Sequence, residues 1–278
     1  MNRQIFNTAI IALCTIGSIL VSCSRNNDTG TTNNNGSPEG KAKLSVYLTD
    51  HQTPVFQQVN LNIVKMEIKV EDNGVDSLGG WYNLNITPGV FDVLRFRNGF
   101  DTLFASGNIP LNRKLQKIRL TLGTQNSVVT GGNTFPLEVK DNDREVIANL
   151  DDSNVDMPAP GQLLFWIDFD AHQSINAKSN NRYELKSHIK IFTRSRSGRI
   201  EGRVLPQAAN AIVKAINGSD TATAVPESNG EYKIVGLNAG TYQLLFDATA
   251  NNYRDTLLTN IIVRNNEDTH VAAITLNR

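Results

Sequence analysis

The chain has 278 residues, of which 40% are hydrophobic and 19% charged, and its 27 basic residues equal its 27 acidic residues in number. Nucleic-acid binding needs a concentrated surface of Lys and Arg, so this balance argues against a nucleic-acid partner. The length corresponds to roughly two domains of about 150 residues, each able to bury a core. Both cysteines, Cys14 and Cys23, lie near the amino terminus. This excludes a disulfide framework, a zinc cage or a catalytic thiol in the folded part.

Residues 1–22 have the features of an export signal. Arg3 gives a positive start, and the apolar run Ala9 to Val21 is too short to cross a membrane core of about 30 Å as a helix. The run ends in Leu20-Val21-Ser22-Cys23, which resembles the bacterial lipobox. We therefore expect cleavage after residue 22 and attachment to the bacterial outer membrane through a lipid on Cys23. The alternative is an ordinary signal peptide with a chance cysteine.

Two polar stretches divide the rest of the chain. Residues 24–40 contain no large apolar side chain, so residues 23–40 are predicted to be a lipidated cysteine and a flexible tether. A second polar break, Arg194 to Gly198, separates 41–195 from 199–278. We place the domain boundary there and expect few contacts to cross it. Residues 24–28 lack an acidic run, so the sequence leaves open whether the domains face the periplasm or the medium.

Residues 41–195 show strand patterns without a long helical period. Apolar and polar residues alternate from 44 to 48, which predicts a half-buried strand. From 59 to 70 the alternation changes phase at Ile63-Val64, which predicts a bulge or burial on both faces. The range Val90–Phe104 has room for a helical turn. Further strands are expected at Trp81–Ile86, Lys117–Leu122, Glu145–Leu150, Gln162–Asp170, Tyr183–Phe192 and the hairpin Ser127–Val139 around Gly131-Gly132-Asn133. This pattern predicts an antiparallel β-sandwich or barrel.

Several ordered motifs in this region resemble one family. They are Lys43–Asp50, Val59–Val70, Trp81–Leu84, Leu115–Leu122, and Leu164–Asp170 with Ser174 and Tyr183–Lys186. Together they resemble the bacterial lipoprotein family called domain of unknown function 4382. The resemblance implies a secreted β domain and no established activity.

Residues 199–278 also consist of strands and tight turns. Asn229-Gly230 predicts a hairpin, and the run Gly230 to Tyr242 resembles the turn pattern of the carboxypeptidase regulatory-like, transthyretin-like β-sandwich. That resemblance implies a seven-stranded module classed with carbohydrate-binding-like folds. Tyr232 and Tyr242 are expected to be core residues, with sugar stacking as the alternative. The predicted fold class is all-β, with two antiparallel β-sandwich domains.

No G-x-S-x-G, P-loop or H-E-x-x-H motif occurs in the sequence. At strand spacing, Asp168, Asp170 and His172 would share one face and could meet Asp50 around a hard cation such as calcium. We favour the alternative, in which the carboxylates accept turn N–H groups. We expect no cofactor and no bound metal.

Two further acidic runs are weaker candidates. Asp152 to Asp156 begins like a calcium loop, but Met157 replaces the required glycine, so a solvated loop is expected. Asp141 and Asp143 lie in a turn-like run with no apolar surroundings to raise a pKa. The four histidines are scattered and have no zinc-ligand spacing.

Four positions resemble the D-[ST]-apolar acceptor for O-glycosylation in Bacteroidetes-type exported proteins. They are Ser77, Thr102, Thr221 and Thr256. A strand start with a capping Asp is the alternative at some of them.

From these observations we expect a non-catalytic, lipid-anchored envelope protein that presents a binding or scaffolding surface. Two alternatives stay open: a carbohydrate-binding accessory lipoprotein, and a calcium-dependent binder or enzyme that uses Asp50, Asp168 and Asp170. The expected partners are the membrane, through Cys23, and a glycan or another envelope protein.

Overall fold

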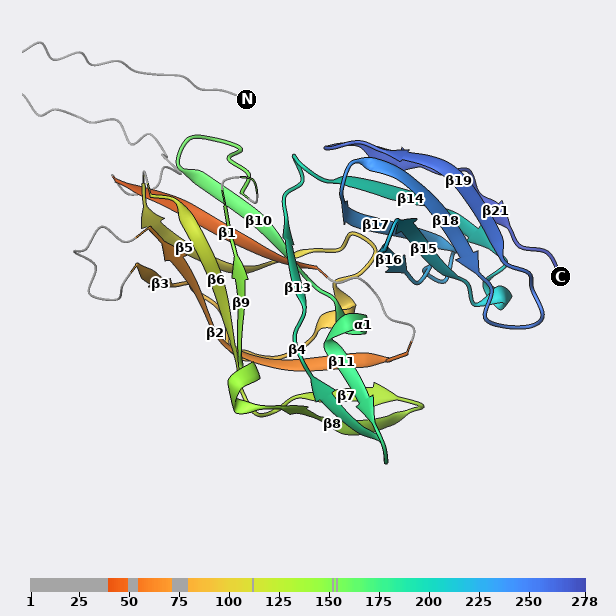
Figure 1. Cartoon of the computed structure of the whole chain (residues 1–278), viewed down its shortest axis with the longest axis horizontal. Helices are drawn as coiled ribbons and strands as arrows, with labels where there is room; N and C mark the ends of the chain where they lie inside the picture. Colours follow the sequence, from red (N-terminus) through yellow and green to blue (C-terminus); the bar gives the residue numbers. More distant parts are fainter. Residues whose placement is uncertain (1–39, 50–54, 72–79, 112, 152, 154) are drawn as a thin grey trace, which may run out of the picture. The chain divides into compact units, whose positions relative to one another are not determined.

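The computed structural model describes residues 40–278 except 50–54, 72–79, 112, 152 and 154. The predictions for Cys23, Asp50, His51 and Ser77 therefore lie outside the described residues. The described chain is all-β, as predicted (Figure 1). Its helical segments are short turns: η1 (Val93–Arg95), η2 (Asp141–Asp143), α1 (Ala171–Ser174) and η4 (Gln207–Ala209). None of these described turns has the length and apolarity needed to cross a membrane.

The region 41–192 contains two sheets. The smaller sheet has the order β13-β10-β1-β5, and the nine-stranded sheet has the order β11-β12-β8-β7-β2-β6-β9, with β3 and β4 also paired to β2. The small sheet consists of β1 (Lys41–Thr49), β5 (Thr102–Pro110), β10 (Gln162–Phe169) and β13 (Ile189–Phe192). The larger consists of β2 (Gln58–Val70), β3 (Trp81–Asn83), β4 (Gly89–Asp92), β6 (Leu115–Leu122), β7 (Ser127–Thr130), β8 (Asn133–Val139), β9 (Glu145–Asn149), β11 (Ile175–Lys178) and β12 (Arg182–Leu185). Most pairs are antiparallel, but β1 pairs with β10 and β12 pairs with β8 in parallel.

β2 contains the predicted irregularity. Its pairing with β6 shifts register between Ile63 and Lys65, so Val64 is the extra residue of a bulge. Ile63 before the bulge and Met66 after it are both fully buried, whereas Val64 is exposed. The extra residue returns the apolar side chains to the core face after the sequence pattern changes phase. The predicted bulge is confirmed.

The hairpin of β7 and β8 is also confirmed. Thr130 pairs with Asn133 across the turn, and both central residues, Gly131 and Gly132, have positive φ angles of 55° and 75°. Two central residues with positive φ give the turn the twist that a two-residue hairpin needs, and glycine adopts this conformation without steric cost.

One hydrophobic core lies between the two sheets. Leu44 of β1 and Phe165 of β10 contribute from the small sheet, and Ile68 of β2 and Ile118 of β6 contribute from the large one. β1 is central in the small sheet, where it pairs with β5 on one side and β10 on the other. Strands from the start and the end of this region therefore meet inside one core.

The predicted strand Tyr183–Phe192 is wrong as one element. It is divided into β12 and β13, which belong to different sheets. Between them, the backbone N–H of Lys186 donates to the carbonyl of Ser174 at 2.8 Å, and that of His188 donates to Ser174 Oγ at 2.7 Å. Ser174 is fully buried, so it satisfies the backbone where the chain passes from one sheet to the other.

The region 198–278 forms two further sheets of four strands, coloured teal to blue in Figure 1. One has the order β17-β14-β20, with β21 also paired to β14, and the other has the order β16-β15-β18-β19. Their strands are β14 (Gly198–Leu205), β15 (Ile212–Asn217), β16 (Asp220–Ala224), β17 (Glu231–Leu237), β18 (Gly240–Asp247), β19 (Thr256–Val263), β20 (Asp268–His270) and β21 (Ile274–Thr275). The region thus has eight strands where the resemblance implied seven, and β20 and β21 both pair with β14 in parallel.

The predicted hairpin at Asn229-Gly230 is wrong. The strands on either side, β16 and β17, lie in different sheets, and of the two residues Gly230 has a positive φ, 86°. Its N–H donates to the carbonyl of Glu227 at 2.8 Å. A Cβ at this position would lie 2.3 Å from the carbonyl oxygen of Val204. Glycine is therefore required here by a close backbone approach at a crossover between sheets.

Tyr232 and Tyr242 belong to the hydrophobic core of this region and are 2% and 4% exposed. The Tyr232 ring packs edge-on against Phe246, with 5.8 Å between ring centroids. A Cβ on Gly202 would lie 2.7 Å from the Tyr232 hydroxyl oxygen, so the glycine makes room for the ring. The core prediction is confirmed for both tyrosines, and the sugar-stacking alternative is wrong.

Candidate functional site

The segment 193–198, which connects the two cores, is held in place by hydrogen bonds and close packing. Ser197 Oγ donates to the carbonyl of Thr193 at 2.6 Å, and both residues are buried. The N–H of Asn266 donates to the carbonyl of Ser197 at 2.8 Å. A Cβ on Gly198 would lie 2.4 Å from the carbonyl oxygen of Arg264. Asn98 and Lys190 also make hydrogen bonds to residues beyond the segment, in the range 225–236. The expectation of few contacts across the boundary is therefore wrong, and the position of the boundary stays a prediction.

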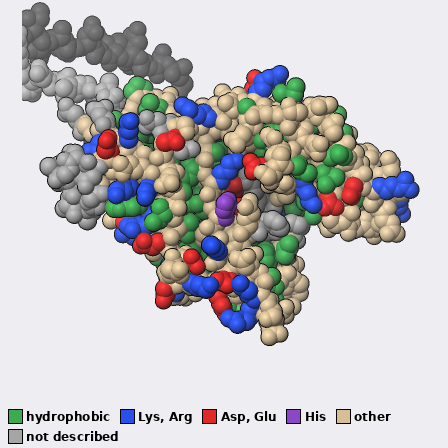
Figure 2. Space-filling model, viewed as in Figure 1, with side chains coloured by type: hydrophobic (Ala, Val, Ile, Leu, Met, Phe, Trp, Pro, Cys, Tyr) green, Lys and Arg blue, Asp and Glu red, His purple; other side chains and the backbone are tan. Residues whose placement is uncertain are grey.

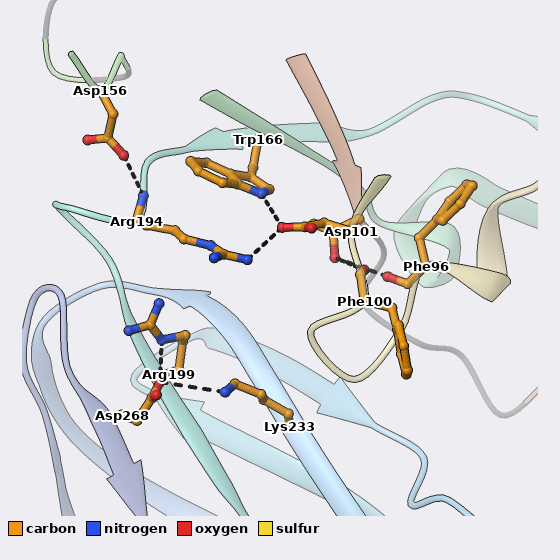
Figure 3. A network of polar contacts seen from close by, with 10 residues as sticks. Phe96, Phe100, Asp101, Asp156, Trp166, Arg194, Arg199, Lys233 and Asp268 are labelled. Atoms are coloured by element: carbon orange, nitrogen blue, oxygen red, sulfur yellow. Dashed lines mark hydrogen bonds and ion pairs between the residues drawn. The ribbon is translucent and has the colours of Figure 1, made fainter. Parts of the chain in front are cut away.

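Arg194 is the centre of a polar network in this segment (Figure 3). Its backbone N–H donates to Asp156 Oδ2 at 3.0 Å, and its Nη2 donates to Asp101 Oδ2 at 2.6 Å. Trp166 Nε1 donates to the same oxygen of Asp101 at 2.6 Å. The Arg194 guanidinium carbon lies 4.9 Å from the centre of the Trp166 ring, a cation–π distance. These contacts hold the start of the linker against β10.

Trp166 is itself held in an aromatic stack. Its ring stacks on Tyr47, with 5.1 Å between centroids, and on Phe192, with 6.1 Å. The three residues come from β1, β10 and β13, which are neighbours in the small sheet, so their side chains meet on one face. A Cβ on Gly236 of β17 would lie 3.0 Å from the Phe192 ring, and Lys190 Nζ donates to the carbonyl of Gly236 at 3.0 Å. The stack therefore extends the small sheet to the C-terminal region.

The loop 96–101 makes a second connection. Asn98 Nδ2 donates to the carbonyl of Val225 at 3.1 Å and to Glu227 Oε1 at 2.7 Å, and Asn98 Oδ1 accepts from the N–H of Lys233 at 3.3 Å. Asn98 and Gly99 have φ angles of 53° and 75°. A Cβ on Gly99 would lie 2.9 Å from Lys233 Cδ. One asparagine side chain thus fixes the loop to three groups of the C-terminal region.

A cavity of about 440 Å³ lies beside this loop, and we call it the Phe100 cleft. Its lining includes Phe100 from the loop and Arg203, Glu231 and His270 from the C-terminal region. Phe100 is 67% exposed, although its loop is fixed by the contacts of Asn98. The cleft therefore offers a rigid aromatic ring beside several hydrogen-bonding groups, the combination expected of a ligand site.

Charged groups at the cleft compensate one another. Glu201 pairs with Lys233 Nζ at 2.6 Å and with His270 Nδ1 at 2.7 Å. Asp268 pairs with Arg199 (Figure 3) and lies 3.7 Å from Lys233 Nζ. Burial acts to raise the pKa of Asp268, but the hydrogen bond from Arg199 and the charge of Lys233 outweigh burial and lower the pKa below its ordinary value. Carboxylates held in ion pairs suit ligand binding better than proton transfer.

Figure 2 shows a mixed distribution of charge on the face that it presents. Lys and Arg side chains are interspersed there with Asp and Glu side chains. Phosphate backbones favour a continuous basic surface, which this face does not offer.

The cation hypothesis loses its geometric basis. β10 ends at Phe169, and Asp170 caps α1 by accepting from the N–H of Gln173 at 2.9 Å. Strand spacing therefore does not reach His172. Asp168 is 1% exposed and lies in β10 between β1 and β13. Within the part of the chain that the structure describes, no group of three or more His, Cys, Asp or Glu residues is placed to hold a metal ion. The turn-capping prediction is confirmed for Asp170.

The other acidic runs have structural roles. Asp156 is not simply solvated, because it accepts from the N–H groups of Arg194 and Ser195, at 3.0 and 3.3 Å. Asp141 lies in the turn η2, as predicted, and pairs with Arg144 Nε at 2.9 Å.

The described glycosylation candidates all lie on strands. Thr102 and Thr256 begin β5 and β19 and are half-buried, whereas Thr221 of β16 is exposed. Asp255, which precedes Thr256, accepts from the N–H of Ala248 at 2.8 Å, as the capping alternative requires. Modification of these residues stays a prediction.

The residues of the junction were not predicted from the sequence. Asp101, Trp166 and Arg194 lie far apart in the sequence, and no motif connects them. The Asn98-Gly99 dipeptide was an available signal, because such dipeptides mark tight turns. It indicates a turn and gives no indication of what the turn contacts.

The comparison with protein families identifies one match, the domain of unknown function DUF4382, over residues 41–187. The match covers more than half of the chain, and the chain belongs to this family. No curated protein matches the chain.

Several solved structures are similar to this chain, with low sequence identities and low TM-scores. A type II cohesin–X-dockerin complex from Acetivibrio cellulolyticus is 24% identical over 28% of this chain and 56% of that chain, with a TM-score of 0.24. The minor pilin of Streptococcus agalactiae is 9% identical over 84% and 96% of the two chains, with a TM-score of 0.22. A fimbrial protein from Bacteroides ovatus is 7% identical over 85% of this chain and 50% of that chain, with a TM-score of 0.27. The aligned part spans about half the length of the first and third of these chains.

Proposed function

We propose that this protein is a non-catalytic lipoprotein of the bacterial outer membrane that presents a binding or scaffolding surface. One observation carries the proposal: the two β cores are joined through Asn98 and Lys190, so both contribute to one fixed surface. A preorganised surface suits recognition, because little conformational entropy is lost on binding. The Leu20 to Cys23 motif supports the lipid anchor, and the Gly230 to Tyr242 pattern supports a carboxypeptidase regulatory-like class for residues 199–278.

Cysteine variants test the anchor. Cells that express the full chain are grown with labelled palmitate, and Cys23→Ala is compared with Cys14→Ala, which changes the other cysteine of the chain. We expect label in the wild type and in Cys14→Ala, and an unlabelled precursor for Cys23→Ala. A wild-type protein that takes up no label and stays in the aqueous phase of a detergent partition would contradict the anchor.

The exposed ring of Phe100 favours a second function, carbohydrate binding in the Phe100 cleft. Sugars combine apolar C–H faces with hydroxyl groups, and the cleft provides an aromatic ring next to Arg203, Glu231 and His270. A glycan array tests this function with the wild type, Phe100→Ala and the control Leu103→Ala, which truncates an exposed apolar residue outside the cleft lining. We expect Phe100→Ala alone to lose binding. An array on which the wild type binds no glycan would exclude the carbohydrate function.

A further inference from the structure

A second and larger cavity borders the Arg194 network. It has a volume of about 950 Å³, and we call it the Met157 groove. Most of its lining comes from three segments, namely residues 110–111 with 113–115, residues 155–166 and the linker residues 194–196, and Ala42 and Asn266 complete it. The volume is at the upper end of the range of about 300–1,000 Å³ that is typical of ligand sites. The groove and the Phe100 cleft have no lining residue in common.

Much of the groove wall is apolar. Leu111, Leu115, Val155, Met157 and Leu163 all line it. Met157 is 75% exposed and Leu111 is 39% exposed. Removing apolar surface from water is favourable by about 25 cal/mol per Å². An alkyl chain that covers these side chains would therefore bind with a favourable free energy.

The charged residues of the lining are mostly cationic. Arg113, Lys114, Arg194 and Arg196 line the groove, and Asp156 is the one acidic residue among the lining residues that the structure describes. Asp156 already accepts from the backbone of Arg194 and Ser195. Arg194 pairs with Asp101. Within the described residues Lys114 and Arg196 have no carboxylate partner, so their charges are available to a ligand.

We propose that the Met157 groove binds a single-chain anionic amphiphile, that is, a molecule with one alkyl chain and a carboxylate or phosphate head group. Lys114 and Arg196 match the head group in charge, and the apolar wall matches the chain. A cationic head group would be repelled, and a purely polar anion would leave the apolar wall exposed to water. This inference goes beyond the proposed function and depends neither on the lipid anchor nor on glycan binding in the Phe100 cleft.

Tryptophan fluorescence measures binding directly. Trp166 lines the groove, and Trp81 is the only other tryptophan of the chain. In Trp81→Phe, Trp166 is therefore a single reporter. We expect a saturable change in its emission with dodecanoate and with dodecyl phosphate below their micelle concentrations. Acetate and inorganic phosphate should give no such change, and dodecyltrimethylammonium should bind at least tenfold more weakly.

Charge variants then test the assigned residues. In the Trp81→Phe background, Lys114→Ser with Arg196→Ser should raise the Kd for dodecanoate about tenfold, which corresponds to about 1.4 kcal/mol. Met157→Asp should do the same, because it places a negative charge at an exposed position of the wall. The matched control is Lys186→Ser with Arg254→Ser, which removes one exposed lysine and one exposed arginine outside the groove lining.

Three results would overturn the proposal. The first is equal affinity for dodecanoate and dodecyltrimethylammonium, which would show that charge does not select the ligand. The second is binding of acetate or polyglutamate as tightly as dodecanoate, which would show a simple anion or acidic-peptide site. The third is an unchanged Kd in the Lys114 and Arg196 double variant while its melting midpoint matches that of the control.

Discussion

The two β regions differ in how far apart along the chain their paired strands lie. In residues 41–192, β1 pairs with β10, so Lys43 lies opposite Gln162. In residues 198–278, β14 pairs with β20, so Arg199 lies opposite Asp268. This separation along the chain is shorter, although it spans most of the region. Pairing of distant strands carries a larger loop-closure cost and forms later than local pairing. Both regions therefore pair their first strand with a late strand, and the first region closes the longer loop.

The two cores differ as well. The core of the first region includes large aliphatic and aromatic side chains from both of its sheets. The core of the C-terminal region is smaller and includes Tyr232, whose buried hydroxyl has no hydrogen-bond partner within the described residues. Burial raises the pKa of this hydroxyl well above its ordinary value. A smaller core has less stability to lose, so single substitutions should affect this region more.

The largest expected effect comes from truncating a core ring in each region. Phe246→Ala and Phe165→Ala both remove a fully buried phenylalanine, and each should lower the free energy of unfolding by about 3–5 kcal/mol. Because whole domains have about 5–15 kcal/mol, Phe246→Ala should greatly lower the melting midpoint of the smaller C-terminal region and leave that of residues 41–192 unchanged. Calorimetry and limited proteolysis measure this. One shared transition in both variants would show that the two cores unfold as a unit.

The next effect concerns the junction between the regions. Arg194→Ala removes a hydrogen bond between charged groups and leaves Asp101 with Trp166 alone, which should cost about 1–3 kcal/mol. Because these contacts hold the start of the linker against β10, we expect cleavage at 194–198 to become faster. Arg196→Ala, at an exposed neighbouring position, is the control. Equal proteolysis rates for the two variants would mean that the Arg194 network does not hold the linker in place.

A smaller effect is expected at the turn that follows β10. Asp170→Ala removes the side-chain acceptor of α1 and should cost about 0.5–2 kcal/mol, as the loss of a helix cap does. Because Asp170 acts as a cap and not as a calcium ligand, the midpoint of the wild type should be the same in millimolar calcium as in chelator. The lower midpoint of the variant should likewise not depend on calcium. Asp141→Ala, in an exposed turn, controls for loss of charge. A calcium-dependent midpoint that Asp170→Ala abolishes would restore the cation hypothesis.

The smallest effect distinguishes the two core tyrosines. Tyr232→Phe removes a buried hydroxyl without a partner and should stabilise the C-terminal region by about 1 kcal/mol, or roughly 4–8 °C in the melting midpoint of a domain of this size. Tyr242→Phe removes a hydroxyl that donates to the carbonyl of Asn238 at 3.0 Å, so it should destabilise the region by about 0.5–1.5 kcal/mol. The same sign for both variants would argue against this assignment of hydrogen bonds.

The sequence by itself determined most of the strands, the bulge at Val64 and the hairpin at Gly131-Gly132. These features depend on the two-residue alternation of side chains along a strand and on the backbone conformations of turn residues. Both can be recognised in short stretches of sequence. Tertiary structure decided which sheet each strand joins: it divided Tyr183–Phe192 between two sheets and turned Asn229-Gly230 into a crossover. It also decided the junction, because Asp101, Trp166 and Arg194 meet only when β5, β1, β10 and β13 form one sheet. Contacts between distant segments depend on packing, which no local pattern encodes.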